Sequence, residues 1–365
     1  MAIRWINAGR VSNYRSQSIY HGLGYAQTPE TPDTVVMVIP EDPYLCIGYF
    51  QEAAKEVNLS FCRDNKLPVI RRETGGGTVF IDSGQMFVQW VCQPGFLPRK
   101  VEHRFQLFNR AIIETYAFFG IQAYHYPVND VHVNGRKITG TGAATIGNAE
   151  VVTGNFLFDF DTEIMTQALN IPNSEFRSVI KSSLNSYMTW IKRELKNPPS
   201  YQEVIRVYRT QCEQVFGTPV VDGEFTKEEV VAIAKSEEKL TREDWLHSVK
   251  ATPSKNKLVK IHAGIWVGWI VHEVGDISVQ VFSQMRNNTL EMIRFYLPQF
   301  LTLTWALDKL ESVLIAAPLE EKEIRQRITG FFSQVNGDKI LISMEDWTKA
   351  VMQIKMEVQK ISGHA

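Results

Sequence analysis

The sequence has few cysteines, and they lie far apart. The chain of 365 residues contains four of them, and no two form a C-x-x-C pair. This spacing excludes a zinc ribbon or a redox dithiol, and so few thiols in a chain of this length are typical of a reducing compartment. The N-terminus also lacks the apolar segment of a secretory signal. We therefore expect a soluble, cytoplasmic protein.

The chain also lacks an excess of charge of either sign. Lysine and arginine number 39, aspartate and glutamate number 40, and the net charge is -1. A protein dedicated to nucleic acid would carry a basic field, so we expect no nucleic-acid partner. The longest uncharged run, residues 83–98, contains two prolines and two glycines and is too short to span a bilayer. We expect no membrane partner either.

Several common catalytic motifs are missing. The sequence has no G-x-x-x-x-G-K-[ST] phosphate loop and no G-x-S-x-G serine motif. Gly140 and Gly142 lack the third glycine of a dinucleotide-binding turn. His272 begins an H-E-x-x-H pattern that has no second histidine. These absences exclude a P-loop enzyme, a serine hydrolase of that class and a zinc protease.

Short apolar runs separated by turn residues dominate the first part of the chain. They predict strands at residues 34–39, 45–48, 68–72, 78–81 and 86–91. Apolar residues at helical spacing predict a helix over residues 105–119, and capping-box patterns at Ser200 and Thr226 begin two more. This order predicts an α+β fold with largely antiparallel sheets flanked by helices.

A polar, proline-containing stretch at residues 251–257 marks a domain boundary. Beyond it we predict strands at 258–264, 266–271 and 277–282, and helices at 304–316 and 319–332. Ser343 is the expected N-cap of a final helix that ends near Ile361. The chain thus divides into residues 1–250 and a smaller α+β domain, residues 257–365, with a terminal helix.

Residues 71–84 contain two arginines followed closely by three successive glycines. Such glycines are costly to order, because glycine loses more backbone entropy on folding than any other residue. One interpretation is a flexible hairpin loop. The other is a segment whose bare backbone lets an anionic ligand approach its N–H groups, with Arg71 and Arg72 supplying positive charge.

A second informative segment is residues 129–143. Asn134 and Gly135 have the chemistry of a type I′ hairpin turn. This turn would fix Lys137 on a strand, with small residues after it that leave room beside its side chain. Hairpin lysines are usually exposed to solvent, and the alternative interpretation is a fixed cation that faces a ligand.

Taken together, the two segments resemble the lipoate–protein ligase branch of the biotin/lipoate ligase superfamily. Residues 71–84 resemble its R-R-x-[ST]-G-G-G-x-V-x-x-D-x-G motif, and residues 129–140 its N-D-[IVL]-x-V-x-G-R-K-[IV]-[ST]-G motif. Residues 43–51 resemble P-x-L-x-I-G-x-x-Q, and weaker landmarks match at 56–58, 189–191 and 244–245. The resemblance covers residues 1–250, and the tail resembles the family's small C-terminal accessory domain.

The resemblance implies a biotin/lipoate ligase-like fold and an ATP-dependent ligase. Such an enzyme activates lipoate to lipoyl-AMP with release of pyrophosphate. It then transfers the lipoyl group to a lysine of an acceptor protein, which is a lipoyl domain, a glycine cleavage H-like protein or a related lipoate-binding protein. Mg²⁺ would accompany the phosphates of ATP, and few protein ligands to it are expected. The mixed anhydride is already activated, so no protein nucleophile is needed.

Residue by residue, the resemblance implies a catalytic role for Lys137 as a point charge. It implies contacts with the lipoyl-adenylate for the remaining motif residues, namely Arg71, Gly75, Gly76, Gly77, Thr78, Asn129, Asp130, Gly140 and Thr141. The sequence departs from the family after the lysine motif. Where family members have G-S-A and then H-G-T, this chain has residues 140–143 and then a histidine-free segment at 152–156.

Three alternatives stay open. A cysteine-dependent octanoyltransferase of the superfamily would need a thiol nucleophile, whereas Cys92 and Cys212 are interpreted as core residues. A lipoyl transferase that uses a preformed acyl donor would keep both motifs. A catalytically silent lipoyl-binding assembly protein is the third, and the intact Arg71, glycine triplet and Lys137 argue against it.

Overall fold

The computed structural model describes residues 2–249, 254–298, 304–334 and 342–362, and these residues form two compact units. The first unit comprises the described residues through Asn170 and those from Leu184 to 249. The second comprises residues 171–183 and the described residues from 254 onward. The predicted boundary at 251–257 falls partly outside the described residues. Assigning catalysis to residues 1–250 and an accessory role to 257–365 stays a prediction.

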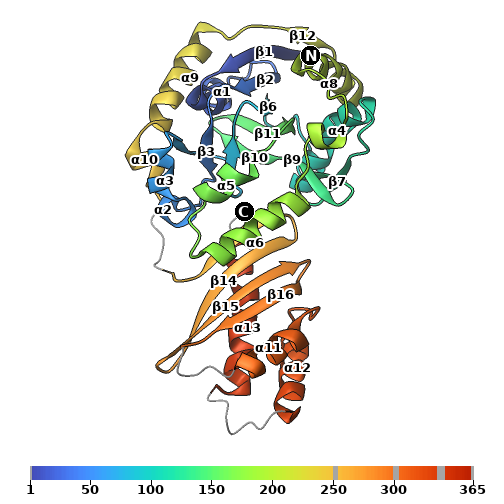
Figure 1. Cartoon of the computed structure of the whole chain (residues 1–365). Helices are drawn as coiled ribbons and strands as arrows, with labels where there is room; N and C mark the ends of the chain where they lie inside the picture. The colour runs from blue at the N-terminus through green and yellow to red at the C-terminus, as the bar shows by residue number, and fades with distance from the viewer. Residues whose placement is uncertain (1, 250–253, 299–303, 335–341, 363–365) are drawn as a thin grey trace. The chain divides into compact units, whose positions relative to one another are not determined.

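A six-stranded mixed sheet forms the centre of the first unit, in the order β10-β11-β6-β2-β1-β12 (Figure 1). Its strands are β1 (Ile3–Val11), β2 (Thr34–Pro40), β6 (Gln85–Cys92), β10 (Gly142–Ile146), β11 (Ala149–Leu157) and β12 (Val220–Asp222). β1 pairs in parallel with β2 and β12, and the other neighbours are antiparallel. The α+β class and the mixed sheets flanked by helices are confirmed.

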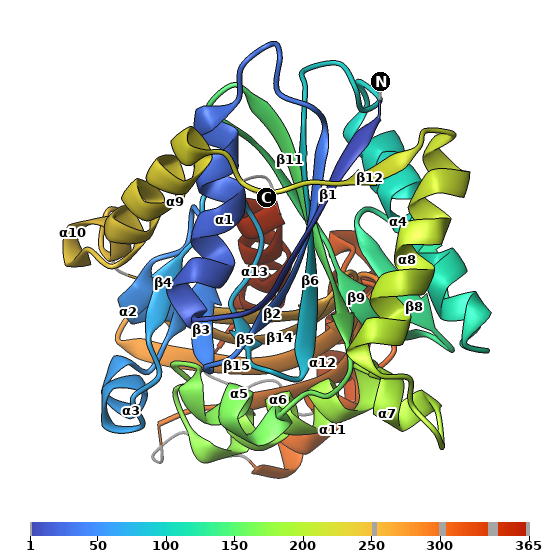
Figure 2. The same ribbon diagram turned by 90° about the horizontal axis from the view of Figure 1, so that it is seen from above.

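Helices cover both faces of this sheet (Figure 2). α1 (Asn13–Ala26) and α9 (Lys227–Leu240) lie on one face, and α4 (Val101–Phe118) and α8 (Tyr201–Phe216) lie on the other. Every residue of β2 is therefore buried. Val35 and Met37 join the core that contains Phe108, whereas Val36 and Val38 join the core that contains Ile233. Burial on both faces explains why β2 is a continuous apolar run.

Local signals place the helices as the sequence predicts. Both capping boxes form, at Ser200 for α8 and at Thr226 for α9. Gly217 ends α8 in the left-handed conformation, with φ 61°. α1 and α9 pack closely at Gly22, where an added Cβ would lie 2.4 Å from the Cα of Ile233. A side chain at this position would push the two helices apart.

Two small sheets carry the predicted motifs. One has the order β4-β3-β5, and the other is the antiparallel sheet β7-β8-β9. Their strands are β3 (Tyr44–Ile47), β4 (Val69–Arg71), β5 (Val79–Ile81), β7 (Tyr124–Tyr126), β8 (Asp130–Val133) and β9 (Arg136–Gly140). Asn134 and Gly135 have φ of 50° and 78° between β8 and β9, which confirms the type I′ turn. Short helices complete the unit: α2 (Ala53–Glu56), α3 (Leu59–Asp64), α5 (Thr162–Ala168), α7 (Ile191–Glu194) and α10 (Glu243–Leu246).

The second unit is also α+β. Its antiparallel sheet contains β13 (Lys257–His262), β14 (Ile265–Val274), β15 (Ile277–Arg286) and β16 (Thr289–Tyr296). Its helices are α11 (Thr304–Leu314), α12 (Glu321–Gln334) and α13 (Met344–Ser362). The N-cap at Ser343 is confirmed, because its Oγ accepts a hydrogen bond from the Asp346 N–H at 3.1 Å. The strand β16 was not predicted, because charged residues such as Glu291 and Arg294 interrupt its apolar pattern.

The sequence did not predict that part of α6 (Ser174–Tyr187) belongs to the second unit. Phe176 packs edge-on against Phe282 of β15, with ring centroids 5.3 Å apart. The hydroxyl of Tyr296 donates to Glu175. These contacts join chain segments about a hundred residues apart, and local patterns do not contain that information.

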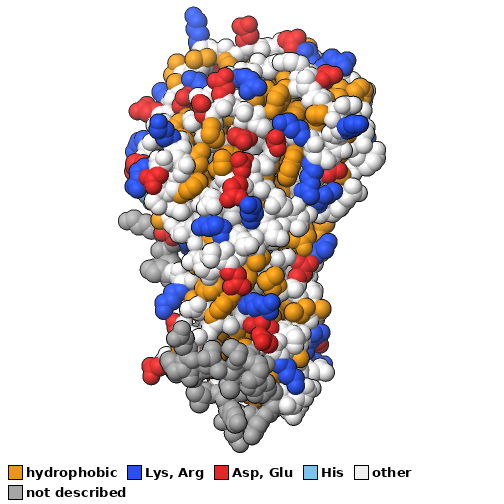
Figure 3. Space-filling view, viewed as in Figure 1, with side chains coloured by type: hydrophobic (Ala, Val, Ile, Leu, Met, Phe, Trp, Pro, Cys, Tyr) orange, Lys and Arg blue, Asp and Glu red, His pale blue; other side chains and the backbone are white. Residues whose placement is uncertain are grey.

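Charges of both signs are mixed on one face of the molecule (Figure 3). Lysine and arginine side chains are interspersed with aspartate and glutamate on the face drawn in Figure 3, as the near-neutral net charge suggests. Within the described part of the chain, no helix combines the length and the apolar character needed to cross a membrane.

The histidine on α1, His21, ties this helix to the segment that follows β4. Its Nε2 accepts a hydrogen bond of 3.1 Å from the Glu73 N–H, so Nδ1 carries the proton and donates to the Gln17 carbonyl at 2.6 Å. The imidazole is 1% exposed. Burial lowers the pKa of His21 from 6.5 to about 4, although the Glu73 carboxylate acts in the opposite direction.

We predict that His21 makes the first unit sensitive to acid. A histidine whose folded pKa lies below its unfolded pKa contributes full stability above pH 6.5, and that stability is lost as the pH falls toward 4. The free energy of unfolding should therefore fall by about 3 kcal/mol more in wild type than in His21→Asn across this window. Denaturant titrations at several pH values measure this difference. His103→Asn is the control, because His103 is an exposed histidine on α4, and the free energy of unfolding of this variant should change with pH as in wild type. If the free energy of unfolding of His21→Asn changed with pH as much as that of wild type, the role assigned to His21 would be wrong.

Candidate functional site

The glycine-rich segment, residues 72–78, connects β4 to β5 and packs against the end of β3. An added Cβ at Gly48 would lie only 2.0 Å from the Gly76 carbonyl oxygen. Gly76 has φ +96°, a conformation that favours glycine. Gln51 Oε1 accepts hydrogen bonds from the Gly48 N–H at 2.9 Å and from the Thr78 hydroxyl at 3.2 Å. The quoted P-x-L-x-I-G-x-x-Q motif thus supports the glycine-rich segment.

Gly75 and Gly77 border open space. An added Cβ at either position would meet no atom within 4 Å. The fold therefore does not require glycine at these two positions for packing, and neither residue has a positive φ. This observation favours the interpretation in which a ligand lies against the bare backbone.

Arg72 is directed back at the segment that follows it. Its Nη2 donates to the carbonyl oxygens of Gly75 at 2.8 Å and Gly77 at 2.9 Å, and its Nη1 donates to the Cys46 carbonyl at 3.2 Å. A guanidinium presents several N–H donors in a fixed plane. One side chain therefore holds the segment at two points, the Gly75 and Gly77 carbonyls. The positive charge of Arg72 stays beside the glycines.

The structure places Arg71 differently from the expected contact with an acyl-adenylate. Its side chain is fully buried. Nη1 donates to the carbonyls of Gly48 at 3.2 Å and Tyr49 at 2.7 Å, and Nη2 donates to Leu246 at 2.7 Å. Nε donates to the Trp245 and Leu246 carbonyls, each at 3.1 Å. This environment favours a role in shaping the segment, and contact between Arg71 and a ligand stays a prediction.

Lys137 lies on β9 and faces a buried carboxylate on β8. Its Nζ is 2.8 Å from Asp130 Oδ1, and the two side chains are 22% and 3% exposed. The stem of Lys137 passes over Gly140, where an added Cβ would lie 3.1 Å from both Cε and Nζ. Glycine at 140 therefore leaves the space that the lysine occupies. Two of the predicted site residues, Asp130 and Gly140, thus set the position of a third.

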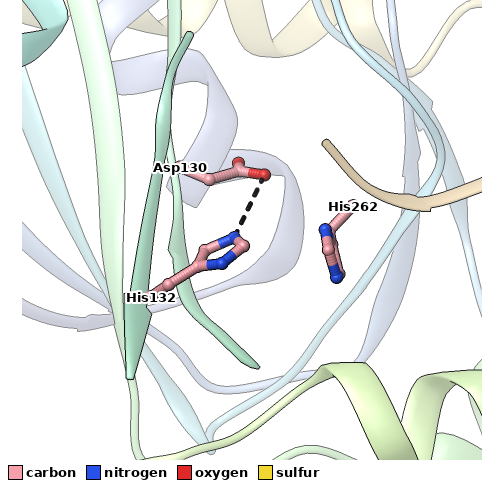
Figure 4. A group of neighbouring side chains, drawn as sticks. All are labelled: Asp130, His132 and His262. Atoms are coloured by element: carbon pink, nitrogen blue, oxygen red, sulfur yellow. Dashed lines mark ion pairs between the residues drawn. The ribbon is translucent and has the colours of Figure 1, made fainter. Parts of the chain in front are cut away.

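Asp130 and His132 project from the same face of β8 (Figure 4). His132 Nε2 is 3.9 Å from Asp130 Oδ2, the pair joined by the dashed line in Figure 4. The imidazole stacks on Tyr126 of β7, with ring centroids 4.3 Å apart and planes inclined by 4°. This packing limits the movement of the β8 side chains beside Lys137. His132 was not among the predicted site residues.

Asn129 and Thr141 bind each other. The Asn129 Nδ2 donates to the Thr141 carbonyl, and the Thr141 hydroxyl donates to the Asn129 carbonyl. This reciprocal pair joins the start of β8 to the link between β9 and β10. Their predicted contacts with an adenylate are not tested, and both side chains have partners within the chain.

The two motif segments lie beside each other in the folded unit. An added Cβ at Gly142 would lie 3.8 Å from the Cβ and Oγ1 of Thr74, in the glycine-rich segment. Gly142 begins β10 and lies two residues after Gly140, the glycine that leaves space for the Lys137 side chain. The Gly140 N–H donates to Asn155 Oδ1 at 3.1 Å, so Asn155 of β11 also borders this region. The sequence had drawn attention to residues 152–156 only because they lack the family histidine.

The four cysteines are all buried. Burial raises the pKa of the Cys46 thiol, raises that of Cys62 to about 11, and raises that of Cys92 well above its ordinary value. Burial also raises the pKa of the Cys212 thiol. A thiol with a raised pKa is protonated near neutral pH and is a poor nucleophile. The core interpretation of Cys92 and Cys212 is confirmed.

Comparison with known proteins finds relatives named as lipoate–protein ligases and octanoyltransferases. A lipoate–protein ligase of Streptococcus pyogenes is 31% identical over 165 residues, which are 45% of this chain and 47% of that protein. The octanoyltransferase LipM of Bacillus cereus is 22% identical over 66% of this chain and 96% of that protein. The match to the Streptococcus ligase thus spans about half of that relative's length.

Solved structures show the same fold. The bipartite lipoate protein ligase of Thermoplasma acidophilum, described with its E2 lipoyl domain, superposes with TM-score 0.63 at 21% identity over 69% of this chain and 99% of that chain. A lipoate-protein ligase A bound with ATP gives TM-score 0.59 at 18% identity, covering 68% of this chain and 100% of that chain. P. falciparum LipL1 in complex with lipoate superposes with a TM-score of 0.55 at 15% identity, and the match covers 97% of this chain and 99% of that chain.

A family model described as the lipoyl protein ligase A/B catalytic domain matches residues 23–213. This span is more than half of the chain and contains the glycine-rich segment, Asp130 and Lys137. The chain belongs to the lipoyl protein ligase A/B catalytic domain family.

Proposed function

We propose that this protein is an ATP-dependent lipoate–protein ligase. The single observation that carries the proposal is the placement of Lys137, whose ammonium is held at 2.8 Å by Asp130 on a rigid hairpin. The glycine-rich segment lies alongside, with two glycines that border open space. Two relatives of this fold support the substrates, since one is described as bound with ATP and another as in complex with lipoate.

The first step joins lipoate to AMP. A lipoate carboxylate oxygen attacks the α-phosphorus of ATP, the bond to the β-phosphate breaks, and pyrophosphate leaves. Negative charge accumulates on the α-phosphate and the leaving group, and a fixed cation stabilises it. An ammonium has three N–H donors, so Lys137 can hold Asp130 with one and reach substrate oxygens with the others.

The second step transfers the lipoyl group. The neutral ε-amine of an acceptor lysine attacks the carbonyl carbon of lipoyl-AMP, AMP leaves with the bonding electrons, and the new amide forms after loss of a proton. Lys137 would stabilise the oxyanion that develops on that carbonyl. The acceptor is a lipoyl domain or a related protein, and the description of the Thermoplasma ligase with its E2 lipoyl domain supports this class.

Magnesium fits this scheme as a companion of the nucleotide. Asp130, the buried carboxylate beside Lys137, already accepts from that lysine, so we assign it to the lysine rather than to a metal. Mg²⁺ would be held mainly by phosphate oxygens and water, as is usual in nucleotide sites. When bound, it would neutralise charge on the phosphates.

The similarity to LipM makes an octanoyl or lipoyl transferase the second candidate. A transferase that works through a cysteine needs a thiolate. The buried cysteines with raised pKa values argue against that mechanism. A transferase that accepts a preformed lipoyl-AMP would need only the second step.

One assay separates these functions. The protein is incubated with ATP, Mg²⁺ and lipoate, and pyrophosphate release is measured before an acceptor lipoyl domain is added and its mass determined. A ligase releases pyrophosphate in a lipoate-dependent manner and increases the acceptor mass. Transfer only from supplied lipoyl-AMP identifies the transferase. Lipoate binding with neither reaction identifies a silent lipoyl-binding protein and overturns the proposal.

Lys137→Ala should lower the rate of lipoyl-AMP formation by at least about a hundredfold, because it removes the charge that stabilises the transition state. Pyrophosphate release measures the loss, and circular dichroism checks the fold. Lys192→Ala is the control, since Lys192 forms a comparable 2.8 Å ion pair with Asp159 on an exposed surface. Near-normal adenylate formation in Lys137→Ala would remove Lys137 from the mechanism.

Gly77→Ala tests whether a ligand lies against the glycine-rich segment. The added methyl group meets no atom of the chain within 4 Å, so stability should change little. If a ligand occupies that space, the KM for lipoate or ATP should rise about tenfold or more. Gly330→Ala on α12 is a matched control, because it too has open space and no positive φ. An unchanged KM for both substrates in Gly77→Ala would place the ligand elsewhere.

A further inference from the structure

The helices that close the first unit lie outside the part of the chain that matches the family. The family model ends at residue 213, whereas α9 and α10 together span residues 227–246. We call residues 227–246 the α9–α10 strap. α9 packs along α1, and the C-terminal part of the strap contacts the glycine-rich segment and β4, the strand that leads into it.

The C-terminal end of the strap exchanges hydrogen bonds with Arg71. The Trp245 indole N–H donates to the Arg71 carbonyl at 2.9 Å. In the other direction, the Arg71 guanidinium donates to the Trp245 and Leu246 carbonyls. The same guanidinium reaches Gly48, whose close contact with the Gly76 carbonyl defines the bend of the glycine-rich segment. Trp245 is therefore linked to that bend through one side chain.

A second connection runs through Lys239. Its Nζ lies 2.5 Å from the Glu73 carboxylate and 4.0 Å from the centroid of the Trp245 ring. The Tyr25 hydroxyl donates to both Glu73 oxygens, at 2.9 and 2.7 Å. Burial would lower the pKa of Lys239, but the hydrogen bond and charge of Glu73 outweigh it and raise the pKa. The lysine thus stays charged and fastens the first residues of the glycine-rich segment.

Apolar packing holds the strap in place between these two connections. Leu240, at the end of α9, is 3% exposed and packs in a cluster with Tyr44, Cys46, Ile70 and Ile81 of the β4-β3-β5 sheet. Arg15 of α1 pairs with Glu237 at 2.8 Å. The strap is therefore anchored on α1 as well as on the small sheet.

We propose that the α9–α10 strap positions the glycine-rich segment for its ligand, with Trp245 and Lys239 as positioning residues. The inference rests on the proposed function, because the ligand is taken to be lipoate or its adenylate. Neither residue has to touch that ligand. They act by holding the backbone of residues 71–78 in the bend that leaves open space beside Gly75 and Gly77.

The test compares Trp245→Phe and Lys239→Gln with wild type. Trp245→Phe removes the indole N–H and keeps an aromatic ring, and Lys239→Gln removes the charge of a half-exposed side chain. Hydrogen–deuterium exchange should accelerate in the peptide that covers residues 71–79 and remain unchanged in β11. Lipoate affinity, measured by calorimetry, should weaken about fivefold, which corresponds to the loss of one hydrogen bond.

Two control variants separate positioning from general stability. Trp5→Phe alters another buried tryptophan, in β1, and should change neither the exchange of residues 71–79 nor lipoate affinity. Lys239→Arg keeps the charge and should restore both properties. Unchanged exchange, or wild-type affinity, in both Trp245→Phe and Lys239→Gln would overturn the inference. If wild type binds lipoate but releases no pyrophosphate, the proposed function fails while these binding and exchange measurements still decide the positioning role.

Discussion

A buried guanidinium must find hydrogen-bond acceptors, because a cation removed from water without partners is strongly destabilising. In this protein that requirement falls on Arg71, which is fully buried and meets it with backbone carbonyls from the end of β3 and from α10. Each of these carbonyl oxygens gains a charged donor at the same time. Three separate segments of the chain therefore meet around one side chain. Arg71 thereby links Trp245 to the residues against which the glycine-rich segment packs.

Features set by neighbouring residues could be predicted from the sequence. The capping boxes at Ser200 and Thr226 and the Asn134-Gly135 turn follow from local rules, and the buried strand β2 follows from its composition. The pairing of Lys137 with Asp130 was not predicted, although both residues were named, since it depends on the register of β8 and β9. The partners of Arg71 could not be predicted, because they are all backbone carbonyls, and those of Trp245 and Leu246 are 174 and 175 residues away in the chain. Every residue has a backbone carbonyl, so the sequence does not indicate which carbonyls accept hydrogen bonds from Arg71.

The chemistry of the candidate site relies on charge and position. The buried Asp130 carboxylate holds the Lys137 ammonium in position. The cysteines are buried, and burial raises the pKa values of their thiols. Activation by ATP suits such a site, because the acyl phosphate anhydride carries the energy for transfer and the protein has to align reactants and stabilise oxyanions. The chain is similar both to a lipoate–protein ligase and to an octanoyltransferase. In this chain the raised thiol pKa values argue against a route through a cysteine thiolate.

The long reach of the Arg71 contacts affects the order in which the protein can mature. The arginine and the glycines are synthesised early, and the residues that complete their surroundings follow 174 positions later. Contacts of such large sequence separation form late in folding, because a long loop must first be closed. A nascent chain that ended at residue 213 would contain the whole family-matched span but would lack the Trp245 and Leu246 carbonyls, which accept hydrogen bonds from Arg71. The glycine-rich segment therefore gains its contacts with Trp245 and Leu246 only after residue 246 has left the ribosome, when the first unit is almost fully made.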